Sequence, residues 1–360
     1  MKRMTRVALI TSGGDCQGLN AAIRGVGKAL YERLDRVEIY GMYDGYRGLI
    51  ECDYKFMEPK DFSGILTRGG TILGTSRQRY IPGKDIVDEE GRSLLPDMLH
   101  TYNRLNLDCL VIMGGNGTQK SAKLLMDAGM NVITLPKTID NDIYGTDFTF
   151  GFHTANDIAT EAIDRIHTTA ASHGRVMCVE IMGNKAGWLT LYSGVAGGAD
   201  VILIPEIPYT IDKVAEVVQR RADSNKGFTI IAVAEGAMEL EESKLKKKDR
   251  ETKRAAERFS SSAYVAQQLQ EMVGVEARNV VPGHIQRDGT PSAFDRVLST
   301  EFGVHAAELI RDDIYGVTVA LKGNSITHNA LKDIAGIAKP VPLDDQMIST
   351  ARNIGISFGD

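Results

Sequence analysis

Residues 132–142 read VITLPKTIDND, an apolar run followed at once by a lysine and two aspartates. The first four residues predict a buried strand, because short apolar runs bounded by turn signals are typical of parallel sheets. Asp140 and Asp142 come where that strand ends, and Lys137 stands three residues before Asp140. Ligands of open α/β sheets bind at the carboxyl ends of strands. We therefore expect this segment to form a strand and to carry part of a binding site.

A second stretch of the same kind lies earlier in the chain. Residues 109–118 read CLVIMGGNGT, in which an apolar strand runs directly into glycines. A glycine loop lets the backbone approach a phosphate closely, and amide groups at such a turn bind anions. A phosphate-binding loop beside two carboxylates and a lysine suggests phosphoryl transfer.

Strand-like runs of this type recur along the chain. Residues 11–24, TSGGDCQGLNAAIR, combine a glycine turn with a helix that we expect to begin near Gly18. This pattern is neither the Walker A loop nor the dinucleotide fingerprint, and a tight turn without a ligand is the alternative. Apolar runs separated by helical patterns indicate parallel sheets covered by helices. The strands that we predict span residues 7–10, 37–42, 109–113, 132–135, 176–181, 201–204 and 228–234.

The composition narrows the class of protein. The chain has 360 residues, 43% of them hydrophobic and 25% charged, which is ordinary for a globular protein and long enough for two domains. A net charge of −5 gives no reason to expect nucleic acid or a membrane as a partner. The four cysteines are scattered without metal-ligand spacing, so we expect a reducing, cytoplasmic setting, with Cys109 and Cys178 as buried thiols. We expect neither a signal peptide nor a transmembrane helix, because the apolar runs are too short.

Residues 239–258 differ from the rest in their mixed charges. We expect a solvated helix or a surface excursion there. The alternative is a basic patch for an anionic ligand, which the intermixed acidic residues disfavour.

Taken together, the motifs resemble those of the 6-phosphofructokinase family, type A. The matching stretches follow the expected order over nearly the whole chain: residues 11–24, 43–49, 68–77, 114–118, 136–142, 182–183 and 283–291. The resemblance implies an α/β fold of two Rossmann-like, three-layer domains with mostly parallel sheets facing a common cleft. It places the phosphoryl-donor (ATP) domain at residues 1–150 plus about 286–335. The fructose 6-phosphate domain would take residues 151–285 plus about 336–360.

The resemblance also implies an activity. Members transfer a phosphoryl group to the O1 hydroxyl of fructose 6-phosphate, the step of glycolysis that gives fructose 1,6-bisphosphate. Asp140 would be the base that takes the proton from that hydroxyl, and Thr138 would lie at the reacting phosphate. Asp142 would help to hold Mg²⁺ or would orient Asp140. In isolation, residues 140–142 would also fit an Asx-type turn after a strand.

The acceptor pocket follows from the same resemblance. Arg175 and Arg278 match cations that reach the 6-phosphate from a neighbouring subunit, so a homotetramer or homodimer with intersubunit active sites is expected. His284 and Arg287 match phosphate contacts of the same chain, for which an arginine is well suited. Glu235 matches a ligand of the sugar hydroxyls. The full set of expected acceptor contacts is Thr138, Asp140, Arg175, Met182, Gly183, Asn184, Glu235, Arg278, His284 and Arg287.

The donor is ATP or pyrophosphate in this family. Gly117 leaves room for the α-phosphate of ATP, where pyrophosphate users carry an acidic residue. Lys137 is a residue that pyrophosphate users carry, so the two markers disagree, and the steric argument favours ATP. The residues expected to contact the donor are Gly13, Tyr43, Arg77, Gln78, Gly115, Asn116, Gly117 and Thr118.

Two residues depart from the pattern of many ATP-dependent members. Asn116 stands where a metal-linked carboxylate is usual, and Asn184 where an arginine helps to stabilise the transferred group. Asn keeps an oxygen ligand for Mg²⁺ but loses its charge. Lys137 could replace part of the missing positive charge, which would make it a third catalytic residue beside Asp140 and Thr138.

Three other functions stay open at this point: a pyrophosphate-dependent enzyme, a non-catalytic regulatory homologue, and a kinase for another phosphosugar or a nucleoside. Allosteric control is a further possibility, because Arg24 and Lys28 match effector-binding positions of bacterial members. The alternative for this pair is one turn of a solvated helix face.

Overall fold

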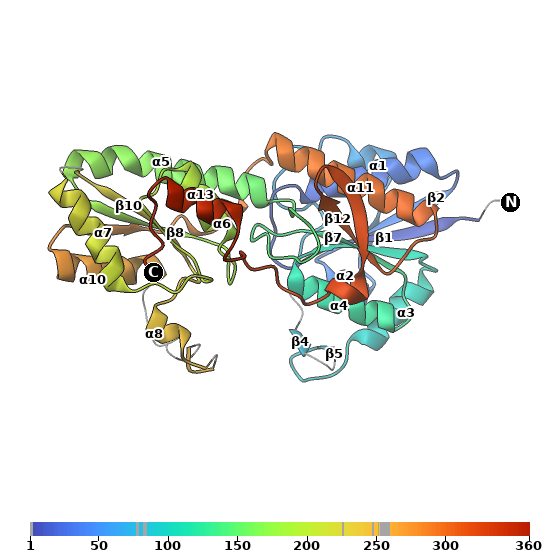
Figure 1. The fold of residues 1–360 in the computed structure, drawn as a ribbon. Coiled ribbons are helices and arrows are strands. Elements are labelled where there is room, and N and C mark those ends of the chain that lie inside the picture. Colours follow the sequence, from blue (N-terminus) through green and yellow to red (C-terminus); the bar gives the residue numbers. More distant parts are fainter. Residues whose placement is uncertain are drawn as a thin grey trace. The chain divides into compact units, whose positions relative to one another are not determined.

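The chain folds into two compact α/β units, shown in the computed structural model of Figure 1. The structure describes residues 3–76, 79–81, 85–224, 227–246, 248–250, 252 and 260–360. Unit 1 comprises Met1–Thr154 and Arg287–Ala338, and unit 2 comprises Ala155–Gln286 and Lys339–Asp360. Each unit is therefore assembled from two separate stretches of chain.

Unit 1 is built on a seven-stranded, mostly parallel sheet. Its strands β1, β2, β6, β7 and β12 pair in parallel, whereas β3 and β13 pair antiparallel at the two edges. Such a mixture is common where parallel strands are joined by helices on both faces. The strand order is β13 (Ser325–Ala330), β12 (Val317–Lys322), β7 (Val132–Pro136), β6 (Cys109–Gly114), β1 (Thr5–Ser12), β2 (Val37–Met42) and β3 (Tyr54–Phe56). The short strands β4 (Arg79–Ile81) and β5 (Asp85–Val87) form a separate hairpin.

Helices cover both faces of the unit 1 sheet (Figure 1). On one face α1 (Leu19–Arg33) packs along α11 (Ala293–Arg311). Their close approach depends on Gly303, because a Cβ there would lie 2.6 Å from the carbonyl oxygen of Ala22. The other face carries α2 (Tyr46–Glu51), α3 (Leu95–Arg104), α4 (Asn116–Asp127) and α12 (Leu331–Ile334). A 3₁₀ turn, η1 (Pro59–Phe62), packs against α1.

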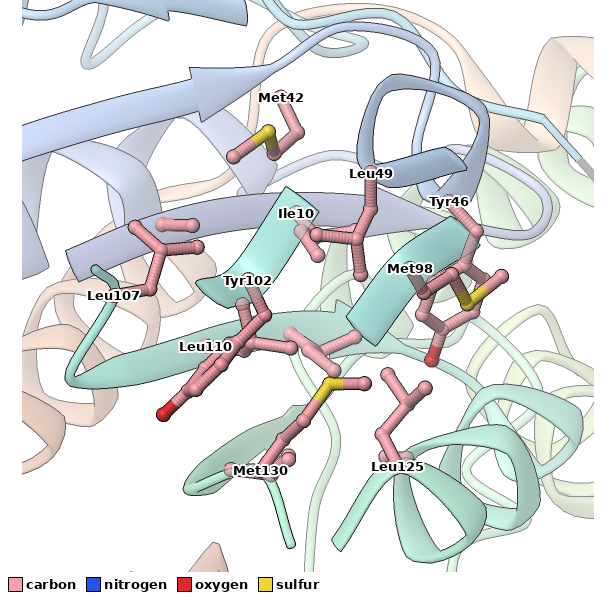
Figure 2. Close-up of a cluster of buried hydrophobic side chains, with 14 of the residues drawn as sticks. Ile10, Met42, Tyr46, Leu49, Met98, Tyr102, Leu107, Leu110, Leu125 and Met130 are labelled. Atoms are coloured by element: carbon pink, nitrogen blue, oxygen red, sulfur yellow. The ribbon is translucent and has the colours of Figure 1, made fainter. Parts of the chain in front are cut away.

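Apolar side chains from the sheet and from α2, α3 and α4 meet in one buried cluster, part of which Figure 2 shows. Ile10 and Leu110 come from the central strands, and Leu125 comes from α4. Burying one such side chain fully stabilises the fold by about 1.5–3 kcal/mol relative to leaving it exposed to solvent. The cluster therefore fixes α4, which follows the glycine loop, against the strands that end at the same edge.

Unit 2 has a smaller sheet in which all strands run parallel. Its order is β11 (Ala277–Val280), β8 (Val176–Ile181), β10 (Thr229–Ala234) and β9 (Val201–Leu203). One face packs on α7 (Ile211–Asp223) and α10 (Ser261–Val273), and the other on α6 (Trp188–Ala196). The helix α13 (Gln346–Asn353) packs against α6, and the 3₁₀ turn η2 spans Gly283–Arg287. The helix α5 (Phe152–His173) begins in unit 1 and continues in unit 2.

The expected architecture is confirmed in its main elements. All seven predicted strands form, as β1, β2 and β6 to β10, and α1 begins at Leu19, next to the expected start. The strands β3, β4, β5, β11, β12 and β13 were not predicted. The four cysteines carry free thiols, and Cys109 and Cys178 are buried as expected. Within the part of the chain that the structure describes, no helix is long and apolar enough to cross a membrane.

The charged run at 239–258 is described only in part. A short helix, α8 (Leu240–Ser243), lies in it with Leu240 exposed. Residues 247, 251 and 253–258 of the run lie outside the described residues. Most of the described residues of the run are exposed, although Glu242 is buried, and this supports the prediction of a solvated segment.

Candidate active site

Three neighbouring strands of unit 1 end level with one another and place three loops side by side. Ser12 at the end of β1 is in register with Gly114 of β6, which is in turn in register with Pro136 of β7. The loops that follow begin with Gly13, Gly115 and Lys137, so the motifs singled out in the sequence meet at one sheet edge. Contacts between the loops confirm this. The hydroxyls of Thr118 and Ser12 lie 3.3 Å apart, and the Lys137 amide donates to the Gly114 carbonyl over 3.2 Å.

The loop after β7, residues 137–142, is buried for most of its length. Thr138, Asp140 and Asn141 are all less than one-tenth exposed, and Asp142 is half-buried. The Asp140 amide donates to the Thr138 hydroxyl oxygen over 3.1 Å, which closes a tight turn. Asn141 has φ +50°, a left-handed conformation that Asn adopts more readily than most residues. We call residues 137–142 the base loop, after the expected role of Asp140.

Lys137 is the buried cation of this loop, with only 3% of its surface exposed. Its ammonium group donates to the carbonyl oxygen of Gly14, in the first glycine loop. Burial lowers the pKa of Lys137, the neighbouring Arg287 lowers it further, and the carboxylates of Asp140 and Asp15 oppose that shift. An ammonium group in a position with so little water attracts nearby anions more strongly than it would in bulk solvent. Such an attraction is useful at a reaction centre that carries negative charge.

Arg287 brings a second positive charge to the same edge. Its Nη1 donates to the carbonyl oxygen of Asp15 over 3.2 Å. The side chain of Gln17 donates in turn to the carbonyl oxygen of Asp288 over 2.7 Å. The chain around Arg287 therefore contacts the first glycine loop, and Arg287 adds a second cation near Lys137 of the base loop.

The second glycine loop opens onto the start of α4. Gly115 is the N-cap residue, and Asn116 and Gly117 form the first turn, where free backbone amides and the helix dipole attract anions. A Cβ at Gly117 would meet nothing within 4 Å, so this position faces open space. Tyr43 follows β2 at the same sheet edge and is half-buried. Arg77 and Gln78, also expected to contact the donor, lie outside the described residues.

In unit 2 a second group of site residues gathers at the carboxyl ends of β8 and β10. Glu235 follows β10, and its Oε1 accepts hydrogen bonds from the amides of Gly183 and Asn184 at 3.2 and 2.6 Å. The Met182 amide donates to the side chain of Gln286 over 3.2 Å. His284, which is exposed, lies in the same short turn as Gln286.

Arg175 and Arg278 lie at the opposite end of the unit 2 sheet. Arg175 precedes β8, and Arg278 pairs with Met177 near the start of that strand. Both arginines bind the carboxylate of Glu276, at 2.7 and 2.5 Å. Since β8 is six residues long, the length of the strand, about 20 Å, separates the arginines from Met182. Within unit 2 the two arginines therefore lie apart from Met182, Gly183 and Glu235.

A family model described as phosphofructokinase matches residues 6–310. The chain belongs to the phosphofructokinase family. It is 54% identical to the ATP-dependent 6-phosphofructokinase of Spirochaeta thermophila, over 98% of this chain and 97% of that protein. It is 46% identical to the ATP-dependent 6-phosphofructokinase of Propionibacterium freudenreichii, over 99% of both chains.

A solved phosphofructokinase shares the fold. The pyrophosphate-dependent enzyme of Marinobacter aquaeolei superposes with a TM-score of 0.80 over 98% of this chain and 92% of that one, at 21% identity. At that identity the likeness concerns the fold alone.

The oxygen ligands near the base loop fit a magnesium ion held jointly by protein and substrate. Asp142 and Asn116 are half-buried residues on the neighbouring loops after β7 and β6. Within the described part of this phosphofructokinase, no group of three or more His, Cys, Asp or Glu side chains is arranged to hold a metal. Mg²⁺ commonly takes only one or two carboxylates and completes its shell with phosphate oxygens and water. The donor set is therefore of the kind expected for Mg²⁺ that arrives with a nucleotide.

Two residues that hold these loops in place were not singled out in the sequence. Gln286 is fully buried and accepts a hydrogen bond from the Met182 amide. In the sequence it stands out only as the residue before Arg287. Asp295 is buried at the start of α11 and bonds to the chain just beyond the base loop. No local pattern marks such residues, because each acts through a contact distant in sequence. The expected effector role of Arg24 and Lys28, one turn apart on α1, stays a prediction.

Proposed function

We propose that this chain transfers the γ-phosphoryl group of ATP to the O1 hydroxyl of fructose 6-phosphate, giving fructose 1,6-bisphosphate and ADP. The observation that carries the proposal is the register of Ser12, Gly114 and Pro136, because it gathers an anion-binding turn, a second glycine loop and the base loop at one edge. The names of the relatives, ATP-dependent 6-phosphofructokinases at 54% and 46% identity, support it.

In the proposed reaction Asp140 accepts the proton of the O1 hydroxyl as the oxygen attacks the γ-phosphorus. The bond between the γ-phosphorus and the bridging oxygen breaks, and its electron pair leaves with ADP. Lys137 would offset part of the negative charge of the phosphates, and Thr138 would donate to the group in transfer. Arg287 would contact the phosphate of fructose 6-phosphate, as His284 would. Mg²⁺, held by Asp142 and Asn116 together with the donor phosphates, would supply further charge neutralisation.

We assign the donor and the base to unit 1, and the sugar phosphate to unit 2. Glu235 would bind the sugar hydroxyls, while Met182, Gly183 and Asn184 would line the pocket and His284 would contact the phosphate. Arg175 and Arg278 would serve the 6-phosphate site of a neighbouring subunit, since they lie at the far end of the sheet from Met182. The active protein is then a homodimer or a homotetramer, and a monomeric variant would lose affinity for fructose 6-phosphate.

The decisive experiment is steady-state kinetics on fructose 6-phosphate with ATP and with pyrophosphate, each with and without Mg²⁺. The proposal requires fructose 1,6-bisphosphate to form with ATP, with a dependence on Mg²⁺. A higher kcat/KM with pyrophosphate would transfer the assignment to the second candidate, a pyrophosphate-dependent enzyme, which Lys137 favours. Binding of fructose 6-phosphate without turnover by either donor would instead identify a non-catalytic homologue, which Asn116 and Asn184 would explain.

We further propose that Lys137 supplies part of the positive charge that Asn116 and Asn184 lack. Its burial and its contact with Gly14 support this role, because they hold the ammonium beside both glycine loops. Lys137→Ala should lower kcat strongly, by roughly 10²-fold or more, as loss of a cation at a phosphoryl transfer site does. Near-full turnover of that variant would refute the role of Lys137 and leave the assignment of the reaction intact.

A further inference from the structure

Asp295 is a buried carboxylate that the proposed reaction does not use. It lies in the first turn of α11 with none of its surface exposed. Its Oδ1 accepts the amide of Gly151 at 3.0 Å, and its Oδ2 accepts the amide and the hydroxyl of Thr154 at 2.7 and 2.5 Å. Burial raises the pKa of Asp295, and these hydrogen bonds lower it in opposition. A desolvated carboxylate is retained only where such bonds satisfy it.

The bonds join the starts of two helices. Gly151 and Thr154 carry amides at the beginning of α5, which have no acceptor within that helix. The N-cap of α11 is Ser292, whose hydroxyl accepts the Asp295 amide at 3.3 Å and whose own amide donates to the Thr154 hydroxyl at 2.9 Å. Asp295 and Ser292 therefore fix the chain at residues 151–154 from the side of α11.

Cys16 also packs closely against this segment. Gly151 has φ +96°, and a Cβ there would lie 2.5 Å from the sulfur of Cys16 and 2.9 Å from its Cβ. No larger residue fits without displacing one of its neighbours. The backbone at Gly151 thus contacts both Cys16 and Asp295, which restricts the position of the residues just before it.

Those preceding residues hold the base loop. The Thr149 amide donates to Oδ1 of Asn141 over 3.1 Å, and the Thr149 hydroxyl donates to the carbonyl oxygen of Thr138 over 2.7 Å. The Phe150 amide donates to the carbonyl oxygen of Pro136 over 3.3 Å. Thr138 and Asn141 lie on both sides of Asp140 in the base loop. Asp140 is therefore positioned by a strip, residues 149–154, whose far end is bound by Asp295.

We propose that Asp295 is a positioning residue for the base loop, acting through Thr149 on the placement of Asp140. This inference rests on the proposed phosphoryl transfer. Asp295 would contact neither substrate. Its loss would let the strip move and would misplace the base by a fraction of an ångström to an ångström, an error that reduces chemistry more than binding.

The test compares the same chemical change at two helix starts. Asp295→Asn replaces one acceptor oxygen by an amide donor, which then faces the N–H of Gly151 or of Thr154. Asp345→Asn is the matched control in unit 2, where the carboxylate of the α13 N-cap accepts the Met347 amide at 2.8 Å. On the full chain, and well below the melting temperature of each variant, Asp295→Asn should lower kcat about tenfold or more, with both KM values within about twofold. Asp345→Asn should leave kcat and KM within about twofold of the unmodified chain.

A second pair of variants separates positioning from a general loss of stability. Thr149→Val removes the hydroxyl that holds Thr138 and should lower kcat, whereas Thr149→Ser keeps the hydroxyl and should restore it. Combined with Asp295→Asn, the Thr149→Val change should add little further loss, since both act through one strip. Circular dichroism during thermal unfolding would confirm that each variant is folded at the assay temperature.

Three results would overturn the inference. The first is an unchanged kcat in folded Asp295→Asn. The second is a double variant whose losses multiply. The third is a Thr149→Val variant with full kcat. If Asp295→Asn does not fold, this third result alone tests the inference. In each case the unmodified chain still forms fructose 1,6-bisphosphate, whereas failure of the proposed function would show as no product from any variant.

Discussion

Replacing Gly117 by Asp should stabilise the fold slightly and abolish most of the activity with ATP. Gly117 is the second residue of α4 and is exposed, and a Cβ there meets nothing within 4 Å. Its φ is not among the positive values, so a side chain causes no backbone strain. The helix propensity of Asp exceeds that of Gly by only about 0.1–0.3 kcal/mol, and a carboxylate in the first turn gains about 0.3–1 kcal/mol. The free energy of unfolding should therefore rise by about 0.4–1.3 kcal/mol.

The effect on activity has the opposite sign. In the proposed donor site the new carboxylate would lie close to the α-phosphate of ATP. Two like charges about 5 Å apart, at an effective dielectric constant of about 20, repel by about 3 kcal/mol. At about 1.4 kcal/mol for each factor of ten, kcat/KM for ATP should fall by roughly 10²–10³-fold. Pyrophosphate has no α-phosphate at that position, so the ratio of pyrophosphate to ATP activity should rise.

Gly117→Ala is the matched control, because it adds the Cβ and the helix propensity without the charge. Coupled assays of fructose 1,6-bisphosphate formation give kcat/KM with each donor, and urea unfolding gives the stability. Gly117→Ala should keep kcat/KM for ATP within about threefold of the unmodified chain. The reasoning is refuted if Gly117→Asp keeps ATP activity within about tenfold of Gly117→Ala, or if it is less stable than the unmodified chain.

Four further outcomes are expected. Gly151→Ala should lose about 3 kcal/mol of stability in thermal unfolding, from the positive φ and the clash with Cys16. Cys16→Ala should recover only the part of that clash that is due to the sulfur, because alanine keeps the Cβ at this position. Lys137→Met should be more stable than the unmodified chain in urea near pH 7, because burial lowers the pKa of Lys137. The stability of the unmodified chain should rise as the pH approaches 10.5, whereas that of the variant should not. Burial lowers the pKa of His305 below 6.5, so stability should fall as the pH drops below about 6.5, and His305→Gln should flatten that slope in calorimetry. Glu235→Gln keeps an oxygen for the Gly183 and Asn184 amides but loses charge, so KM for fructose 6-phosphate should rise about tenfold in steady-state assays with KM for ATP unchanged.

Most of the strands that could be predicted have side chains that are buried on both faces. Residues 109–113 and 132–135 are apolar throughout because helices cover both sides of the sheet, and that pattern is visible in the sequence alone. The strand β12 was missed although five of its six residues are buried. Its Thr318 is satisfied by Thr134 and Gln119, at 2.6 and 3.1 Å, and no local pattern shows that partnership.

Edge strands and the supports of the site are harder to predict, for a related reason. The strand β13 is half-exposed and polar, so only its pairing with β12 makes it a strand. The loops at the sheet edge could be inferred, since each follows an apolar run. Asp295 could not be inferred, because its contacts join residues more than a hundred positions apart.

The place of β12 in the sheet has a consequence for synthesis. The strand β7 pairs with β6 on one side and with β12 on the other, yet β12 follows β7 by roughly 180 residues. At a synthesis rate of about 5–20 residues per second, β12 is made roughly 9–36 s after β7. Until then the apolar β7 presents unpaired amides and carbonyls, the kind of strand edge on which chains aggregate. Nascent chains should therefore depend on chaperones most between the emergence of residue 136 and that of residue 322. Truncations that end between these positions should be insoluble.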